Sequence, residues 1–172
     1  MKTRIIIVDE TDSPIGLKAY GTLNYEDIYR VSALWITDKE GGDNLLAQRG
    51  WDAKNDPGKW AAAVAGTVDE GETYSQNIEK EAVEELGLTG LTFETGPKQF
   101  IDDGSHKFFC QWFFASIKKT ASNIKIQEEE VAGTKWISTN ELLAEVEMHP
   151  EKYVPSAKET LMVLGMLSEQ LP

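Results

Sequence analysis

Three glutamates at helical spacing are the residues of this chain best suited to chemistry. Glu81, Glu84 and Glu85 stand at positions i, i+3 and i+4, so on an α-helix they share one arc of the surface, about 100° wide. Like charges at this spacing repel one another and weaken a helix unless a cation lies against them. Carboxylate oxygens alone suit a hard ion such as Mg²⁺ or Mn²⁺ rather than zinc. The pattern therefore predicts a divalent metal site that acts on phosphate groups.

The residues around these glutamates have a fixed spacing of their own. Gly66 is followed after five residues by Glu72, and after seven more by Lys80 and Glu81. This arrangement resembles the Nudix box, a family motif that spans residues 66–88 of this chain. The departure from the family pattern is Lys80, where the family has arginine. Lysine keeps the positive charge but lacks the planar guanidinium that binds a carboxylate through two parallel hydrogen bonds.

A row of glutamates on a helix is more often only a solvated face, and the fixed Gly66, Gly71, Glu72 and Gly87 around the run argue against that alternative here. The ends of the helix are marked independently. Thr73 and Gln76 have the spacing of a capping box at the start of a helix. Gly87 suits the position just past the end of a helix, where the backbone turns left-handed. An apolar stripe runs beside the acidic one and consists of Ile78, Ala82 and Leu86. The segment is therefore predicted to be a loop, a helix with one buried face, and a second loop.

The resemblance implies a role for each fixed residue of the box. The catalytic residues and metal ligands would be Glu81, Glu84 and Glu85, for a Mg²⁺ (or Mn²⁺) cofactor; Glu84 would be either a third ligand or the catalytic base. The residues that support the box would be Gly66, Glu72, Lys80 and Gly87, with Glu72 orienting Lys80. Nudix enzymes often take the catalytic base from a glutamate outside the box. The candidates for it in this chain are Glu128, Glu129 and Glu130, for each of which a charged loop residue is the alternative.

Residues outside the box resemble one Nudix subgroup, the isopentenyl-diphosphate-isomerase-like proteins. The shared features are Gln48-Arg49 and a Pro-Gly-x-Trp sequence that ends at Trp60. In the true isomerases a catalytic cysteine precedes the box glycine and a histidine follows it, whereas this chain has Ala65 and Thr67. An isomerase needs a proton donor and a proton acceptor at the alkene, and alanine supplies neither. The isomerase is therefore the alternative to a hydrolase, and the hydrolase is predicted.

The predicted reaction is Mg²⁺-dependent hydrolysis of the diphosphate linkage in a nucleoside diphosphate derivative or a related organic diphosphate. Such a reaction needs a positioned water, neutralised phosphoryl oxygens and a stabilised leaving group, and bound metal ions serve all three needs. Arg49 is the candidate for binding the substrate, because a guanidinium can hold two phosphate oxygens at once; a surface ion pair is the alternative for Arg49. A third interpretation, a binding module without activity, is disfavoured by the intact glutamates. The sequence names neither the substrate nor the number of metal ions.

The overall composition limits the partners of the chain. Its 172 residues carry a formal charge of −12, with a pI near 4.6, which argues against binding nucleic acid or an anionic membrane through charge. The single cysteine, Cys110, excludes an intrachain disulfide and fits a reducing compartment. No signal peptide or membrane-spanning stretch is recognisable. We therefore expect a cytoplasmic enzyme with a small-molecule diphosphate substrate and with neither nucleic acid nor membrane as partner. A homodimer is compatible with the sequence.

The elements that must position these residues follow from turn signals and periodicity. Apolar runs predict strands at Arg4–Val8, Tyr29–Thr37, Asn44–Arg49, Ala62–Thr67, Lys98–Ile101 and Lys107–Ile117, with a short strand at Trp136–Ile137. Helices are predicted at Thr73–Leu86, Thr139–Glu147 and Ala157–Leu171, the last two with capping-box pairs at Ser138–Glu141 and Ser156–Glu159. This order predicts an α+β fold with a central mixed β-sheet flanked by helices. The resemblance implies the Nudix α/β/α sandwich with a loop-helix-loop box, as a single domain over residues 1–172.

Overall fold

The computed structural model describes residues 4–120 and 123–166, and the strands within them form one nine-stranded sheet. In chain order the strands are β1 (Arg4–Val8), β2 (Pro14–Ala19), β3 (Ile28–Asp38), β4 (Asn44–Arg49), β5 (Trp60–Ala62), β6 (Val64–Thr67), β7 (Glu94–Asp102), β8 (Lys107–Ile117) and β9 (Val131–Ile137). The helices are α1 (Tyr74–Leu86), α2 (Thr139–Met148), the short 3₁₀ segment η1 (Pro150–Lys152) and α3 (Ala157–Val163).

Strand β3 is the centre of this sheet. One of its edges pairs in parallel with β8 over the full length of the strand. The other edge pairs antiparallel with β1, β6 and β4 in succession. Beyond these neighbours, β2 extends from β1, β7 from β8, and β5 and β9 from β4, all antiparallel. The mixed sheet expected from the sequence is thereby confirmed.

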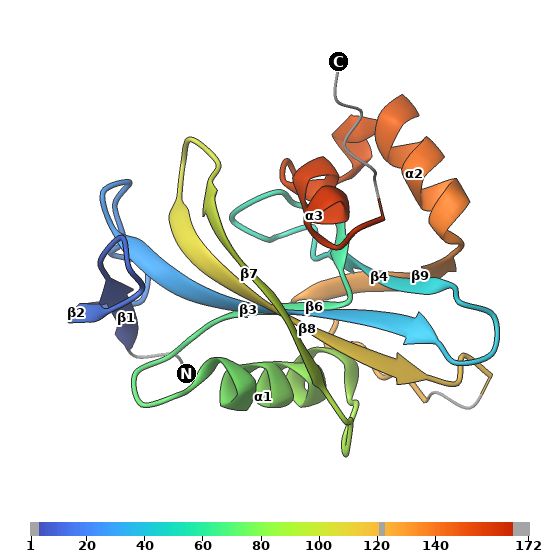
Figure 1. Cartoon of the computed structure of the whole chain (residues 1–172), viewed down its shortest axis with the longest axis horizontal. Helices are drawn as coiled ribbons and strands as arrows, with labels where there is room; N and C mark the ends of the chain where they lie inside the picture. Colours follow the sequence, from blue (N-terminus) through green and yellow to red (C-terminus); the bar gives the residue numbers. More distant parts are fainter. Residues whose placement is uncertain (1–3, 121–122, 167–172) are drawn as a thin grey trace.

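Both faces of the sheet are buried, which explains why its central strands are continuous apolar runs rather than alternating ones. Successive side chains of a strand point to opposite faces. In β3, Leu34 and Ile36 pack in the cluster that contains the apolar stripe of α1. Ala33 and Trp35 pack in a second cluster with residues of α2 and α3. Helix α1 covers one face and the two later helices cover the other (Figure 1), so the α/β/α sandwich is confirmed.

The predicted caps at both ends of α1 and at the start of α2 are present in the structure, and α2 ends at Met148, one residue later than predicted. The Thr73 side chain accepts a hydrogen bond from the Gln76 N–H, and the Gln76 side chain accepts one from the Thr73 N–H. At the other end of α1, Gly87 adopts a φ of 65°, a left-handed conformation that glycine takes without strain. Ser138 and Glu141 form the same reciprocal pair at the start of α2.

The start and end of the third helix differ from the prediction. Ser156 and Glu159 do not form a capping box, because Ser156 has a ψ of 2° rather than the extended backbone of an N-cap. The helix ends at Val163, and Gly165 then turns left-handed with a φ of 72°. Residues 167–171 of the predicted helix lie outside the described residues.

The strand predictions were right in place and wrong in several bounds. The predicted strand Ala62–Thr67 is two strands, β5 and β6, that are separated at Ala63. Strands β7 and β9 begin earlier than predicted, at Glu94 and Val131. Strand β2 was not predicted, because almost all of its residues are exposed and none of the alternation of a half-buried strand is visible.

Over residues 4–120 and 123–166, the helices are all too short or too polar to cross a membrane.

Candidate active site

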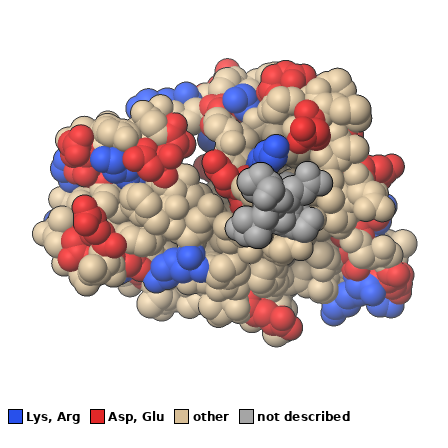
Figure 2. Space-filling view, turned by 45° about the horizontal axis from the view of Figure 1, so that its top comes forward, with Lys and Arg blue, Asp and Glu red and all other residues tan. Residues whose placement is uncertain are grey.

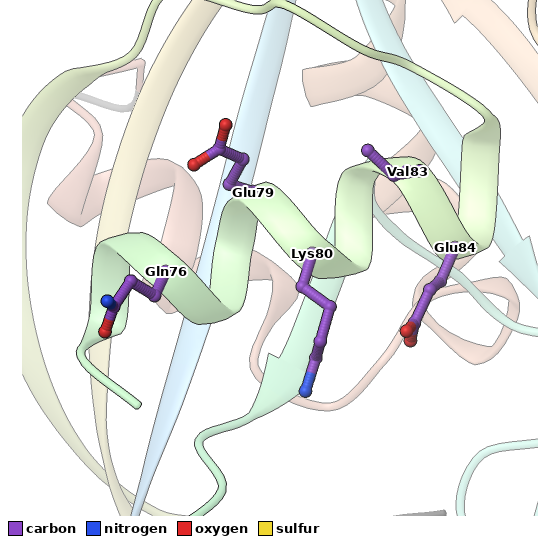
Figure 3. Close-up of a pocket in the computed structure, with 5 residues that line it drawn as sticks. All are labelled: Gln76, Glu79, Lys80, Val83 and Glu84. Atoms are coloured by element: carbon purple, nitrogen blue, oxygen red, sulfur yellow. The ribbon is translucent and has the colours of Figure 1, made fainter. Parts of the chain in front are cut away.

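Helix α1 turns two of the three predicted glutamates inward and leaves the third outside. Glu81 is 2% exposed and Glu85 is 9% exposed, one helical turn apart, whereas Glu84 is exposed. Glu84 and Lys80 extend from the same flank of the helix (Figure 3) and line a hollow of about 380 Å³ on its outer face. The structure therefore buries Glu81 and Glu85 on the inner side of α1 and leaves Glu84 on its exposed side.

Glu81 lies directly against the backbone of β6. A Cβ atom on residue 66 would lie 2.5 Å from Glu81 Oε1, a distance that real Cβ contacts do not show. The fixed glycine of the box is therefore explained by space: Gly66 lets a buried carboxylate approach the strand. Since β6 pairs with β3 along one edge, this approach sets the carboxylate against the sheet itself.

Asn77 holds the inner side of the box together, and the sequence analysis did not single it out. It is fully buried on α1, and its Nδ2 donates to Glu81 Oε1 at 3.2 Å and to Glu72 Oε2 at 3.0 Å. Asn77 Nδ2 also lies 3.1 Å from the carbonyl oxygen of Thr67. Asn77 Oδ1 accepts a hydrogen bond from the Ser32 hydroxyl on β3. The one signal in the sequence was a poor helix former four residues before Glu81, a spacing at which side chains on a helix meet.

Lys80 binds the loop of the box through two carboxylates. Its Nζ lies 2.6 Å from Glu72 Oε1 and 3.1 Å from Asp69 Oδ2, and 4.0 Å from Glu81 Oε1. The expected contact between Glu72 and Lys80 is therefore present. The second oxygen of Asp69, Oδ1, is buried and lacks a hydrogen-bond partner among the described residues. A single ammonium group satisfies less of this carboxylate than a guanidinium fork would.

The charge state of the loop follows from these contacts. Burial alone would raise the pKa of Glu72, but hydrogen bonds from Lys80 and Asn77 outweigh that effect and hold the pKa below its usual value. Burial alone would likewise lower the pKa of Lys80, and its two carboxylate partners raise it instead. Both groups are therefore charged near neutral pH.

Two further predicted segments lie beside the end of α1. The Gln127 N–H donates to the Glu85 carbonyl at 2.9 Å, and the Gly50 N–H donates to the Glu130 carbonyl at 2.7 Å. The candidate outer glutamates Glu128, Glu129 and Glu130 are thus next to the box, and all three are exposed. Glu128 and Glu129 line a hollow of about 320 Å³ together with residues that follow β4.

Arg49 ends β4, directly before Gly50, and is half-buried. Its Nε donates to the carbonyl oxygen of Asn55 at 2.9 Å. This hydrogen bond joins the following loop to the end of the strand, and within residues 4–120 and 123–166 no acceptor is recorded for the other guanidinium nitrogens. Acidic and basic side chains are interspersed over the face shown in Figure 2, where no continuous basic patch appears.

The donor set of the inner face suits a hard divalent cation, because it consists of carboxylate oxygens. Among residues 4–120 and 123–166, no group of three His, Cys, Asp or Glu side chains already has the arrangement of a complete metal site. The close approach of Glu81 to Gly66 does place a carboxylate where a cation could also reach the backbone of β6. The layered sheet and the loop-helix-loop with its buried carboxylates define a Nudix-type site.

Comparisons with known proteins agree with this class. The family model of the NUDIX domain matches residues 28–159. An uncharacterised Nudix hydrolase of Pseudomonas aeruginosa, PA4841, is 25% identical over 154 residues, which cover 90% of this chain and 88% of that one. An isopentenyl-diphosphate Delta-isomerase of Brevibacterium linens is 24% identical over 162 residues, with coverage of 88% and 85%.

Solved structures share the fold. The crystal structure of DR0079 from Deinococcus radiodurans has a TM-score of 0.78 and 20% identity, and the match covers 92% of this chain and 97% of that one. The Nudix domain of Shewanella oneidensis NrtR, crystallised with ADP-ribose, has a TM-score of 0.61 and 17% identity, with coverage of 79% and 85%. The chain belongs to the Nudix family, as the box predicted, and it is an enzyme of the Nudix hydrolase class.

Proposed function

We propose that this chain is a Mg²⁺- or Mn²⁺-dependent hydrolase that cleaves the diphosphate linkage of a nucleoside diphosphate derivative or a related organic diphosphate. The observation that carries the proposal is the buried pair of carboxylates on α1, with Glu81 pressed against Gly66 and held by Asn77. Two ionised carboxylates one helical turn apart on a helix repel each other. A cation bound between them would offset that repulsion.

Each residue of the box has a separate role in this proposal. Glu81 and Glu85 would hold the metal, which when bound supplies charge neutralisation on the phosphoryl oxygens and acidifies a water. Asn77 fixes the orientation of the Glu81 carboxylate through its Nδ2. The ion pair between Lys80 and Glu72 attaches the loop of the box to the helix. Glu84, which is exposed on the outer flank, would contribute to metal binding only after a change of side-chain conformation.

The catalytic base is proposed to be a glutamate outside the box. Glu128 and Glu129 are exposed at the hollow beside the end of α1. Backbone hydrogen bonds attach their segment to Glu85 and to the residue after Arg49. A substrate lying across Glu85 would therefore have these carboxylates on one side, and Arg49 is proposed to bind its phosphate oxygens.

The second candidate function is an isomerase, which the relatives named isopentenyl-diphosphate isomerases favour. The position of the expected catalytic cysteine is Ala65, exposed on β6. Cys110, the single cysteine of the chain, cannot replace it, because it is buried in β8 and burial raises the pKa of its thiol to about 12. This geometry supports the hydrolase over the isomerase.

The test is a panel of diphosphates, each incubated with Mg²⁺ or Mn²⁺ and analysed for released products. The panel includes ADP-ribose, because a protein of the same fold was crystallised with it, and isopentenyl diphosphate for the isomerase. For the substrate that is cleaved, Glu85→Gln is expected to lose at least ~10²-fold in rate, the scale for removing a group that stabilises charge in the transition state.

The matched control is Glu79→Gln, which removes the same charge from an exposed position of the same helix. It is expected to keep the wild-type rate. Cleavage of no member of the panel, together with isomerisation of isopentenyl diphosphate, would overturn the proposal. An unchanged rate for Glu85→Gln would refute the assignment of the metal site.

A further inference from the structure

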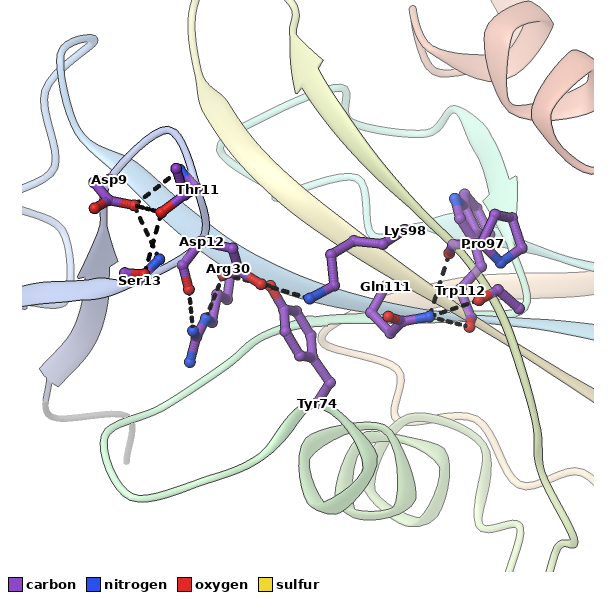
Figure 4. Close-up of polar contacts among 11 residues, drawn as sticks. Asp9, Thr11, Asp12, Ser13, Arg30, Tyr74, Pro97, Lys98, Gln111 and Trp112 are labelled. Atoms are coloured by element: carbon purple, nitrogen blue, oxygen red, sulfur yellow. Dashed lines mark hydrogen bonds and ion pairs between the residues drawn. The ribbon is translucent and has the colours of Figure 1, made fainter.

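The carboxylate of Asp12, in the turn between β1 and β2, is surrounded by donors from three other elements (Figure 4). Arg30 on β3 donates through Nε at 2.6 Å, and its Nη2 donates to the Asp12 carbonyl at 2.6 Å. Lys98 on β7 reaches Oδ2 at 2.5 Å. The hydroxyl of Tyr74, the first residue of α1, lies 3.1 Å from both oxygens.

This donor set fits a phosphate group better than it fits a single carboxylate. Two cations face one negative charge, so the three charged groups sum to an excess of positive charge in a chain that is otherwise strongly acidic. A guanidinium, an ammonium and a phenolic hydroxyl together are the donors that phosphate oxygens take up. Lys98 and Arg30 also lie over the Tyr74 ring, at 4.7 Å and 5.4 Å from its centroid, which keeps both cations in place when the anion changes.

Asp12 is the member of this cluster that lies in a turn beside an exposed edge strand. Strand β2 is exposed along most of its length and is held by β1 along one edge, and hydrogen bonds from Thr11 and Ser13 to the Asp9 carboxylate order the turn itself. Release of Asp12 therefore requires a rearrangement of this turn and of none of the buried elements. Asp12 itself has a φ of 63°, a left-handed conformation that is uncommon for a residue with a side chain. Lys98 is 40% exposed, so the cluster is open to solvent on that side.

We propose that Arg30, Lys98 and Tyr74 form a binding site for a phosphate group of a ligand, and that Asp12 occupies this site in the free protein and leaves it when the ligand binds. The site is distinct from the glutamate pair: Glu81 follows Tyr74 by seven residues, about 10 Å along the helix axis. The proposal goes beyond the proposed hydrolysis and requires no metal ion.

The test uses inorganic pyrophosphate and isothermal titration calorimetry in EDTA, so that no metal ion holds the probe at the glutamates. Asp12→Gly removes the competing carboxylate, and glycine adopts a φ near 63° without strain. It is expected to bind pyrophosphate at least about tenfold more tightly than the wild type. Glu10→Gln removes the same charge from an exposed position of the same turn and is expected to bind like the wild type.

Two comparisons decide the result. Adding Lys98→Met to Asp12→Gly is expected to abolish the gain. A gain no larger than that of Glu10→Gln, or one that survives the loss of Lys98, overturns the proposal. The proposal would also be overturned if the wild type binds no pyrophosphate at a pyrophosphate concentration about a hundred times the dissociation constant measured for Asp12→Gly. Asp12 would then be a fixed structural anion.

If Asp12→Gly does not fold, Lys98→Met in the otherwise unchanged chain takes its place. It is expected to weaken the binding of pyrophosphate to the wild type about fivefold, and an unchanged affinity would overturn the proposal.

The source of the phosphate group is separated by a kinetic arm, with a substrate from the diphosphate panel and Mg²⁺. If the group belongs to the substrate, Asp12→Gly lowers KM and added pyrophosphate competes with the substrate. If it belongs to a second ligand, pyrophosphate changes kcat without competing. If pyrophosphate binds in EDTA as expected, while the panel with Mg²⁺ or Mn²⁺ shows no cleavage and isopentenyl diphosphate is isomerised, this site is supported and the proposed hydrolysis is refuted. The two proposals can therefore fail independently.

Discussion

Replacing Lys80 by methionine is expected to weaken the box from within. The ammonium group lies 2.6 Å from Glu72 and 3.1 Å from Asp69, and the three side chains are between 17% and 30% exposed. Lys80→Met leaves two half-buried carboxylates facing each other without this cation. Breaking a fully buried ion pair costs about 3–5 kcal/mol and an exposed one about 0.2–1 kcal/mol. The intermediate burial of this cluster gives an expected loss of about 2 kcal/mol in the free energy of unfolding.

The assay is urea unfolding followed by tryptophan fluorescence, with the wild type, Lys80→Met and Lys80→Arg at pH 7. Lys80→Arg is expected to be at least as stable as the wild type, because a guanidinium offers a second N–H group for Asp69 Oδ1, a buried oxygen for which the described part of the chain holds no hydrogen-bond partner. A loss below about 0.5 kcal/mol in Lys80→Met, the range of ordinary surface substitutions, would refute the reasoning.

The same variants give a pH dependence of known sign. The pKa of Glu72 is lowered in the folded protein from its usual 4.5, so its stabilising contribution is present above that value and is lost as the pH falls through the lowered pKa. The difference between wild type and Lys80→Met should therefore shrink under acid conditions. A stability difference between the two proteins that stays constant at pH values below the lowered pKa of Glu72 would show that the ion pair does not cause it.

Two further predictions concern buried positions. Gly66→Ala is expected to lose about 1–3 kcal/mol of stability and most of the hydrolytic rate, because its methyl group would displace the Glu81 carboxylate; Gly16→Ala, where a Cβ meets nothing within 4 Å, is the control, and equal effects of the two would contradict the argument. Since burial raises the pKa of the Cys110 thiol to about 12, a disulfide reagent at pH 8 should label the protein only in urea. Rapid labelling of the native protein would show that β8 opens.

Local chemistry made much of the fold predictable. The capping residues identified both ends of α1 and the start of α2, because a cap is decided by a few neighbouring side chains and the backbone between them. The long apolar runs of β3 and β8 were visible because both faces of the sheet are covered. Strand β2 was not recognised from the sequence, since an exposed edge strand needs no apolar pattern.

The sequence predicted which residues belong to the site, but it did not predict which of them are buried. Helical spacing placed Glu81, Glu84 and Glu85 on one arc, but what packs against each position decides which of them is buried, and spacing does not contain that information. Asn77 was missed for a related reason: its burial and its hydrogen bond with Ser32, which is 45 residues away in the sequence, arise only in the folded chain. The cluster at Asp12 likewise joins four separate elements.

The parallel pairing of β3 with β8 has a consequence for the order in which the enzyme can assemble during synthesis. The box is complete once residue 88 has been made, yet the strand on which it rests has one whole edge open until residues 107–117 arrive. When two strands so far apart in the sequence pair, the chain between them loses conformational entropy before the pairing stabilises the fold. Folds with many such contacts form slowly. A ribosome-bound chain that ends before β8 should therefore carry the acidic helix on a sheet whose β3 strand is unpaired along one edge. The core cluster under α1 should be complete only after Phe113 and Ala115 of β8 have emerged.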